Sequence, residues 1–234
     1  MAASRKTSSG NRLLDSIPLR DRQRLVRQCE EVELVPGDLL YKLGEPLDHA
    51  CFPIDGFVAL LSPVDANLMQ VGMVGNEGMV GASLALGVDQ LMMHAVVLGG
   101  GSAWRIGAGT LTAELERSPG LRRRLNRYLC VMIGQLAQNA GCARYHLVEA
   151  RLARWLLMAR DRAHGDSFFI THELLADMLG VRRVGVTQAA GTLQKQQLIT
   201  YRRGNVDILD ARGLETAACD CYQEGKRMYE DMLA

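Results

Sequence analysis

The stretch from Ile170 to Ile199 constrains the fold of this chain more than any other, because it predicts two short helices joined by a tight turn. Thr171 is a good N-cap for the first helix, since its hydroxyl can accept a hydrogen bond from a free amide of the first turn. Glu173 places negative charge at the positive end of the helix dipole, and Gly180 can end the helix in the left-handed conformation without strain. The stretch therefore predicts a helix-turn-helix.

The second helix of this pair is expected to begin near Arg182 and to carry a polar outer face. Val186, Ala190 and Leu193 are spaced four and three residues apart, which keeps them together on the buried face. Arginine matches O6 and N7 of guanine, and glutamine matches the edge of adenine, when such a helix lies in a major groove. We expect bases to be read by Arg183, Val184 and Gln188, and phosphates to be bound by Thr171, His172, Arg182, Lys195, Arg202 and Arg203.

The charge and the strand pattern around this helix strengthen the interpretation. From Arg182 to Arg203 the chain holds five basic residues and no acidic residue. Two β-type runs then flank Arg203-Gly204-Asn205, which indicates a hairpin and hence a wing beside the second helix. Two amphipathic helices around a glycine also occur in helical domains that bind no nucleic acid. The wing and the acid-free window favour DNA as the partner.

This segment resembles the C-terminal winged helix-turn-helix of the bacterial Crp/Fnr family of transcription regulators. The matching features are Thr171, the ADMLGVRR turn of residues 176–183, Val186, Leu193 and the QQLITYRRG sequence of residues 196–204. The resemblance implies that Arg183, Val184 and Gln188 occupy base-reading positions. The chain departs from the family at Val184, where an acidic or polar residue is common, and this departure concerns the preferred DNA sequence rather than the docking.

Composition is typical of a water-soluble globular chain of two domains: 234 residues, 48% hydrophobic and 23% charged. The net charge is only +1, so no global basic field indicates nucleic acid, and basic residues must act by clustering. No run of about 20 apolar residues occurs, and no secretory h-region is present at the N-terminus. We therefore expect no membrane association and a cytoplasmic location.

The first half of the chain changes from a polar start to short apolar runs. Residues 1–12 are predicted to be a disordered tail, and a short helix is predicted from Leu19 to Glu30. From Val32 to Ile106, turn signals recur at short intervals, which predicts an antiparallel β-sandwich or barrel. Residues 13–117 resemble the jelly-roll effector domain of the same family, and VPGDLLYKLGEPLDHACFPIDGFVALL matches its opening strands.

Residues 118–146 predict one long helix with an apolar residue every three to four positions. Such a narrow stripe indicates a coiled-coil-like helix that forms a homodimer, as in the family, although a helix that packs only on its own sheet remains the alternative. A dimer would place two recognition helices about 34 Å apart on one face of DNA. The predicted stripe consists of Leu121, Leu125, Tyr128 or Leu129, Met132, Leu136, Asn139 or Ala140, and Ala143.

Residues 147–234 are predicted to form the winged helix-turn-helix domain. A helix is expected from near Leu147 to Asp161, a short strand at residues 168–170 pairing with the wing, and one amphipathic helix from Ala211 to Leu233. The domain holds twelve basic and twelve acidic residues, so it is neutral as a whole. DNA binding therefore depends on which face carries the basic residues.

The resemblance also suggests where an effector would bind. Family members that bind cyclic nucleotides use a short helix opening with Gly-Glu and a following Arg-Ser-Ala, because the phosphate needs backbone amides and a cation. Here the sequence NEGMVGASLALGVDQLMMHAVV retains the glycine but lacks the glutamate and the arginine. We expect the effector, if one is needed, to be a small molecule other than a cyclic nucleotide. The candidate pocket residues are Gly81, Ala82, Ser83, Met93 and His94.

Six cysteines are scattered along the chain, which fits a reducing compartment and mostly buried thiols. Residues 1–28 contain no cysteine, so the N-terminal iron–sulfur site of some family members is not expected. Cys142 and His146 stand four residues apart and could share a metal, but such pairs often arise by chance. Cys219 and Cys221 are too few for a zinc site on their own. An ordinary structural role for His49 and His94 is a better interpretation than haem ligation. No metal and no cofactor are therefore expected.

Enzyme signatures are incomplete. No His-x-His pair of a jelly-roll oxygenase occurs, and His172-Glu173 lacks the second histidine of a metalloprotease because Ala176 stands there. Gly99–Ser102 has neither the P-loop nor the dinucleotide pattern and is interpreted as a hairpin turn. The predicted protein is not an enzyme.

The predicted protein is an α+β homodimeric transcription regulator that binds a near-palindromic site in double-stranded DNA, with RNA polymerase as a further partner. The alternative is a cyclic-nucleotide or other small-molecule binding module with a vestigial helix-turn-helix.

Overall fold

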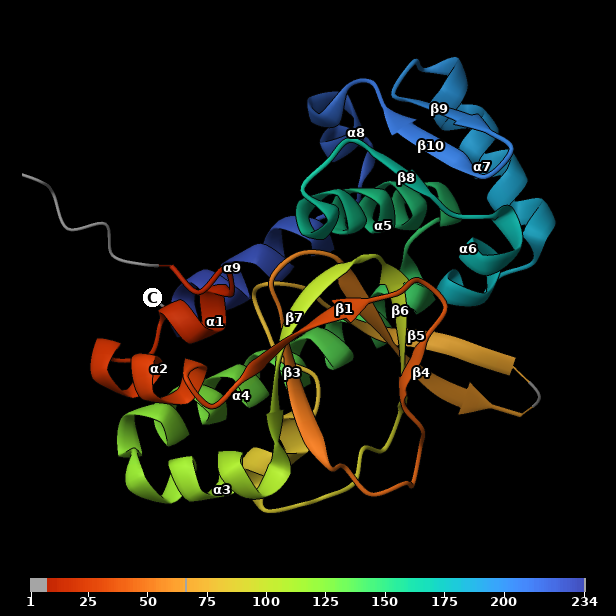
Figure 1. Cartoon of the computed structure of the whole chain (residues 1–234). Coiled ribbons are helices and arrows are strands. Elements are labelled where there is room, and N and C mark those ends of the chain that lie inside the picture. Colours follow the sequence, from red (N-terminus) through yellow and green to blue (C-terminus); the bar gives the residue numbers. More distant parts are fainter. Residues whose placement is uncertain (1–7, 66, 234) are drawn as a thin grey trace, which may run out of the picture.

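The computed structural model describes residues 8–65 and 67–233, and Figure 1 shows their arrangement. Two β-sheets and the helices α1 to α4 form the N-terminal part. The teal and blue elements of the C-terminal part lie above these sheets in Figure 1, and helix α9 runs from there back towards α1. This architecture confirms the predicted α+β class with a β domain, a long helix and a C-terminal winged helix-turn-helix.

The N-terminal domain is a sandwich of two antiparallel sheets. One sheet has the order β1-β7-β3, with β1 Glu30–Leu34, β7 Gly101–Gly107 and β3 His49–Pro53. The other has the order β2-β6-β4-β5, with β2 Leu39–Tyr41, β6 His94–Gly99, β4 Phe57–Val64 and β5 Asn67–Val74. Phe52, Val58 and Ile106 are buried in the core between them, where their apolar side chains leave water.

The connection from β6 to β7 differs from the prediction of a hairpin turn at Gly99–Ser102. These strands belong to different sheets, so the glycines carry the chain from one sheet to the other. The crossing is tight: a Cβ on Gly99 would lie 2.4 Å from Cδ1 of Phe57, and one on Gly101 would lie 2.5 Å from the carbonyl oxygen of Asp55. Only glycine leaves room for this approach. The short helix η1, Ala82–Leu86, and α3, Ala108–Arg117, complete the domain.

Residues 8–12 are packed against the sandwich, contrary to the prediction of a tail through residue 12. The amide of Asn11 is fully buried and donates to the carbonyl oxygens of Pro53 and Gly78, while its Oδ1 caps α1, Arg12–Asp15. Residues 1–7, predicted to be disordered, lie outside the described residues. Helix α2, Leu19–Val26, ends earlier than predicted, because Glu30 already pairs with Arg105 in the β1–β7 ladder.

The long helix predicted within residues 118–146 is present as α4, Pro119–Tyr145. Ser118 caps it by accepting from the amide of Leu121 at 3.0 Å. The first part of the predicted dimer stripe, however, is buried inside the same chain: Leu121, Leu125 and Tyr128 belong to the core of the sandwich. This part of the helix therefore packs on the sheet of its own chain, which is the alternative to a dimer helix stated above. The exposed side of α4 instead presents Cys130, Ile133, Ala137 and Ala140.

The C-terminal domain is organised around helix α5. Its elements are α5 Val148–Ala163, β8 Ser167–Phe169, α6 His172–Leu179, α7 Arg183–Lys195, β9 Ile199–Arg202, β10 Asn205–Ile208, α8 Ala211–Ala217 and α9 Cys221–Leu233. The short strands form an antiparallel sheet in the order β8-β10-β9. This confirms the predicted α5, the hairpin and the strand that pairs with it.

The single helix predicted from Ala211 to Leu233 is wrong, because the chain breaks between α8 and α9. Ala218 is extended and Cys219 is buried, so the chain changes direction at this point. Helix α9 then returns along α4, where Gly134 leaves room for Met228 and the hydroxyl of Tyr229 lies 3.4 Å from Oε1 of Gln135. Contacts with a helix far away in sequence thus override the amphipathic pattern.

The two domains are in direct contact. Trp155 of α5 packs edge-on against Phe57 of β4 and donates its indole N–H to Oε1 of Gln70 at 2.9 Å. Arg162 of α5 forms a buried ion pair with Glu77 of the N-terminal domain. The winged domain is therefore docked on the β4–β5 side of the sandwich. No helix within the described residues is both long and apolar enough to cross a membrane.

Candidate nucleic-acid interface

The helix-turn-helix forms as its local signals predict. The hydroxyl of Thr171 accepts from the amide of Leu174 at 3.1 Å, and Gly180 ends α6 in the left-handed conformation at φ 61°. Helix α7 begins at Arg183, one residue later than expected. The predicted stripe of Val186, Ala190 and Leu193 is buried, together with Ala189, beneath the opposite face of this helix.

The first two turns of α7 present the predicted base-reading residues to solvent. Arg183, Val184 and Gln188 are all exposed, and Val184 is 65% exposed although it is apolar. Thr187 lies on the same face, although it was not among the residues predicted to contact DNA. Its position four residues after Arg183 was the available signal, because such residues are neighbours on a helix surface. An exposed valine beside polar groups that can hydrogen-bond suits contact with a base edge that carries a methyl group.

His172 does not support the expected phosphate contact. Its Nδ1 lies 3.1 Å from the hydroxyl of Thr187, and its Nε2 is buried without a hydrogen-bond partner among the described residues. The ring also stacks on Tyr201, with centroids 4.2 Å apart. Burial, and then the positive charge of Arg183, lower the pKa of His172 below its ordinary value. The residue therefore supports the recognition helix from behind and is unsuited to holding an anion.

The five basic residues of the acid-free window are all exposed: Arg182, Arg183, Lys195, Arg202 and Arg203. Among the described residues, none of them forms an ion pair with a carboxylate, so their charges are available to a partner. They fall into two groups and one outlier. Arg182 and Arg183 lie at the start of α7, Arg202 and Arg203 lie on the wing, and Lys195 lies about 18 Å along α7 from Arg183. Thr171, which is uncharged, lies at the start of α6, at the opposite end of that helix from the turn.

The wing hairpin turns through two residues in the left-handed region. Arg202 of β9 pairs with Asn205 of β10, and Arg203 and Gly204 between them have φ values of 51° and 87°. Two consecutive positive φ values are typical of the tight type I′ turn that joins twisted strands. Gly204 also lies against the ring of Phe169, where a Cβ would approach a ring carbon to 2.5 Å. This turn holds the Arg203 side chain at the tip of the wing.

Four of the five residues predicted to line an effector pocket lie around one hollow. A hollow of about 320 Å³ lies between the η1 region and α4. Gly81, Ala82, Ser83 and Met93 line it, with Met132 and neighbouring apolar residues of α4 opposite, and no charged residue is among its lining. His94 does not line it. Its Nδ1 instead accepts from the amide of Leu43 at 3.3 Å.

A second group of residues was not foreseen as one site. Cys142 and His146 at the end of α4 meet Cys219 and Cys221 at the α8–α9 break, and their ligand atoms all lie within 4.8 Å of one another. The sequence presents them as two separate pairs, because 77 residues separate Cys142 from Cys219. The signal that could have joined them is the total of four sulfur and imidazole ligands in a Cys-x-x-x-His and a Cys-x-Cys pair. The hydrogen bond between the thiols of Cys142 and Cys219 lowers the pKa of Cys142 and raises that of Cys219.

The arrangement of a jelly roll, a long helix and an exposed winged helix-turn-helix defines the class of protein. Residues 150–217 match the family described as the Crp-like helix-turn-helix domain. The chain thus carries a Crp-like helix-turn-helix domain and has, over most of its length, the fold of the Crp/Fnr family of transcription regulators.

Solved structures support this assignment of the fold. FixK2 from Bradyrhizobium japonicum has a TM-score of 0.68 at 14% identity, over 82% of this chain and 98% of that one. A Crp/Fnr family transcriptional regulator from Thermus thermophilus has a TM-score of 0.66 at 21% identity, over 81% and 98% of the two chains. CLP, a c-di-GMP responsive global regulator from Xanthomonas campestris, has a TM-score of 0.65 at 16% identity, over 82% and 99%. No curated protein sequence matches the chain.

Proposed function

We propose that this protein is a sequence-specific DNA-binding transcription regulator that acts as a homodimer on a near-palindromic site. The observation that carries the proposal is the exposed face of α7, where the side chains of Arg183, Val184 and Gln188 form no hydrogen bond or ion pair with the described residues, at the end that would enter a major groove. Arg202 and Arg203 on the wing would contact phosphates beside it, together with Arg182 at the start of α7 and Thr171 at the start of α6.

The exposed side of α4 supports dimer formation. Ile133 is 65% exposed, which is unusual for a large apolar side chain in the middle of a helix. Cys130, Ala137 and Ala140 continue the line at spacings of three and four, and the small alanines allow a second helix to approach closely. Two copies of α4 packed along this line would present two recognition helices to one face of DNA. The seam proposed within residues 118–146 is therefore this line rather than the partly buried stripe.

The pocket favours an uncharged effector. A cyclic nucleotide carries a phosphate that needs a cationic or amide-rich cradle, and the lining of the hollow beside η1 contains no cation. Small apolar molecules fit its chemistry better, through contacts with Met93 of the sandwich and Met132 of α4. A bound dimer would act on transcription through RNA polymerase, the partner expected for a regulator of this fold.

Selection of duplexes from a random pool tests the proposal. The wild-type chain, at about 0.15 M salt, is expected to enrich a near-palindromic motif, and a panel of cyclic nucleotides that includes cyclic di-GMP is expected to leave the motif unchanged. Ile133→Asp is expected to give a monomer in analytical ultracentrifugation and to lose the second half-site. Failure to bind any duplex at low salt would instead support a small-molecule module with a vestigial helix-turn-helix.

A further inference from the structure

The four-residue cluster at the joint between the domains has the composition of a metal site. Cys142 lies in the last turn of α4 and His146 is its C-cap, while Cys219 lies in the α8–α9 break and Cys221 opens α9. Residues four apart on a helix share a face, so Cys142 and His146 point the same way. From this geometry we propose that Cys142, His146, Cys219 and Cys221 bind one thiophilic divalent cation, with Zn²⁺ as the ion that fits best.

Two distances between the ligand atoms are close to those of a tetrahedron around a single ion, and all four ligand atoms lie within 4.8 Å of one another. Sγ of Cys142 lies 3.6 Å from Sγ of Cys219, and Sγ of Cys221 lies 3.7 Å from Nδ1 of His146. A tetrahedral zinc site with Zn–S bonds of about 2.3 Å places two sulfurs about 3.8 Å apart and a sulfur and a nitrogen about 3.5 Å apart. The sulfur separation is too long for a disulfide, whose S–S bond is about 2.05 Å. All three cysteines are free thiols.

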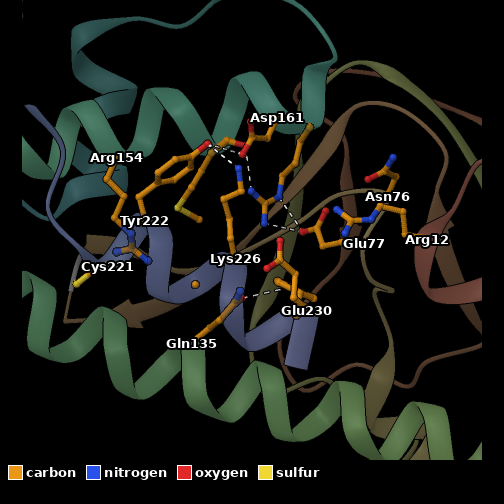
Figure 2. A pocket seen from close by; sticks show the side chains of 14 residues that line it. Arg12, Asn76, Glu77, Gln135, Arg154, Asp161, Cys221, Tyr222, Lys226 and Glu230 are labelled. Atoms are coloured by element: carbon orange, nitrogen blue, oxygen red, sulfur yellow. Dashed lines mark hydrogen bonds and ion pairs between the residues drawn. The ribbon is translucent and has the colours of Figure 1, made fainter. Parts of the chain in front are cut away.

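A buried arginine beside the cluster is a second, independent observation. Arg154 of α5 is only 8% exposed and, among the described residues, has no carboxylate within ion-pair distance; its Nε has no hydrogen-bond partner. Figure 2 shows it beside Cys221. A buried charge without a counter-charge is costly. Three thiolates and a neutral imidazole around a divalent cation leave one negative charge in excess, which Arg154 would neutralise.

The surroundings also provide access for a cation. A hollow of about 260 Å³ between α4, α5 and α9 has Cys221 and Arg154 at one end, and both acidic and basic side chains line the rest of it, among them Asp161, Glu230 and Lys226 (Figure 2). His146 is exposed, so one ligand can move without opening the core. An ion could therefore enter and leave the folded protein.

The position of the cluster gives the site a role in regulation. His146 ends α4 and Leu147 is the N-cap of α5, so this is the joint from the sandwich to the winged domain. A bound ion would tie that joint to the start of α9 and hold the winged domain in its docked position. The effect on DNA affinity rests on the proposed function, whereas the metal site does not.

Zinc titration of the full-length protein tests the site without DNA. The metal-free chain is expected to bind one Zn²⁺ in competition with a chromophoric chelator, and Co²⁺ is expected to give the absorption of tetrahedral thiolate coordination. His146→Ala and Cys142→Ser should weaken zinc by more than about 100-fold, and Arg154→Met by about 10-fold. Cys29→Ser, at a partly buried free cysteine outside both the cluster and the proposed dimer seam, is the matched control and should bind zinc like the wild type.

The outcomes separate the site from the function. Equal zinc affinity for the wild type and His146→Ala would overturn the proposal, as would a Co²⁺ spectrum without thiolate bands; the exposed position of His146 lets this variant fold. A disulfide between Cys142 and Cys219 in the protein purified under reducing conditions would overturn it too. If zinc binds as expected but changes no DNA affinity, the site stands and its regulatory role fails.

Discussion

The guanidinium of Arg162 on α5 contacts the carboxylate of Glu77 through two nitrogens, with Nη2 at 2.6 Å and Nε at 2.8 Å from Oε1. Both side chains are less than a tenth exposed, and the pair joins the winged domain to the sandwich. The carboxylate also accepts from the backbone amide of Gly75. Burial lowers and the facing carboxylate raises the pKa of Arg162, and the net effect is a raised pKa, so the guanidinium stays charged.

Glu77→Gln is therefore expected to destabilise the folded chain strongly, because it leaves Arg162 buried without a counter-charge. The free energy of unfolding in urea should fall by about 3–5 kcal/mol. Asp166→Asn removes the exposed partner of Arg160 and serves as the control, with an expected loss of no more than about 1 kcal/mol. Similar losses for the two variants would show that the buried pair does not hold the domains together.

Base reading and phosphate binding should separate in DNA measurements. Arg183→Ala is expected to cost about 1–3 kcal/mol at the selected site and to relax preference at one base pair per half-site. Arg202→Ala or Arg203→Ala should weaken selected and random DNA alike and flatten the salt dependence of binding. Fluorescence anisotropy over a range of salt concentrations gives both quantities. If Arg183→Ala weakens both DNAs equally, the arginine reads no base.

Val184 offers only an apolar contact, and its most suitable target is the methyl group of thymine. Replacing the contacted thymine by deoxyuridine removes that methyl and should cost the wild type about 0.8 kcal/mol of binding. In Val184→Ala the same replacement should cost much less, since the contact is already lost. Binding of both proteins to both duplexes, measured as a double-mutant cycle, checks this. A coupling near zero at every thymine of the site would exclude the contact.

The lowered pKa of His172 predicts a pH dependence of stability. Burial, followed by the charge of Arg183, disfavours the protonated ring in the folded state, so the unfolded chain binds the proton more readily. The contribution is complete above the ordinary pKa of about 6.5 and is lost as the pH falls below it. His172→Phe keeps an aromatic ring against Tyr201. It should reduce the change in the urea midpoint between pH 7 and pH 5. Identical slopes for both proteins would mean that His172 titrates normally.

The parts of the structure that depend on neighbouring residues were predictable. Thr171 caps α6 and Gly180 ends it through contacts within one or two turns, so their residue types suffice. The break between α8 and α9 was missed because it depends on α4, which lies far away in sequence and receives Met228 and Tyr229. The position of His172 was missed for the same reason, since Tyr201 and Thr187 cover it from other elements.

The cysteine cluster shows the same limit most clearly. Cys142 and Cys219 meet only because α9 turns back along α4, and no spacing within either pair reveals that meeting. The basic window from Arg182 to Arg203 was different, because its charges need only be exposed and free of acidic neighbours. Local charge and helix caps can be predicted from short segments of sequence. A site shared by two distant segments can be predicted only when the tertiary fold is known.

Helix α4 forms a wall of the apolar hollow through Leu129, Met132 and Leu136, and it carries Cys142 about 9 Å further along. With an ion bound as proposed, the effector in the hollow and the metal ion would both contact helix α4. Thermodynamic linkage then requires reciprocity: an effector that changes zinc affinity by some factor has its own affinity changed by zinc by that same factor. The zinc content of a preparation would then alter the affinity measured for any effector that is coupled to the metal in this way.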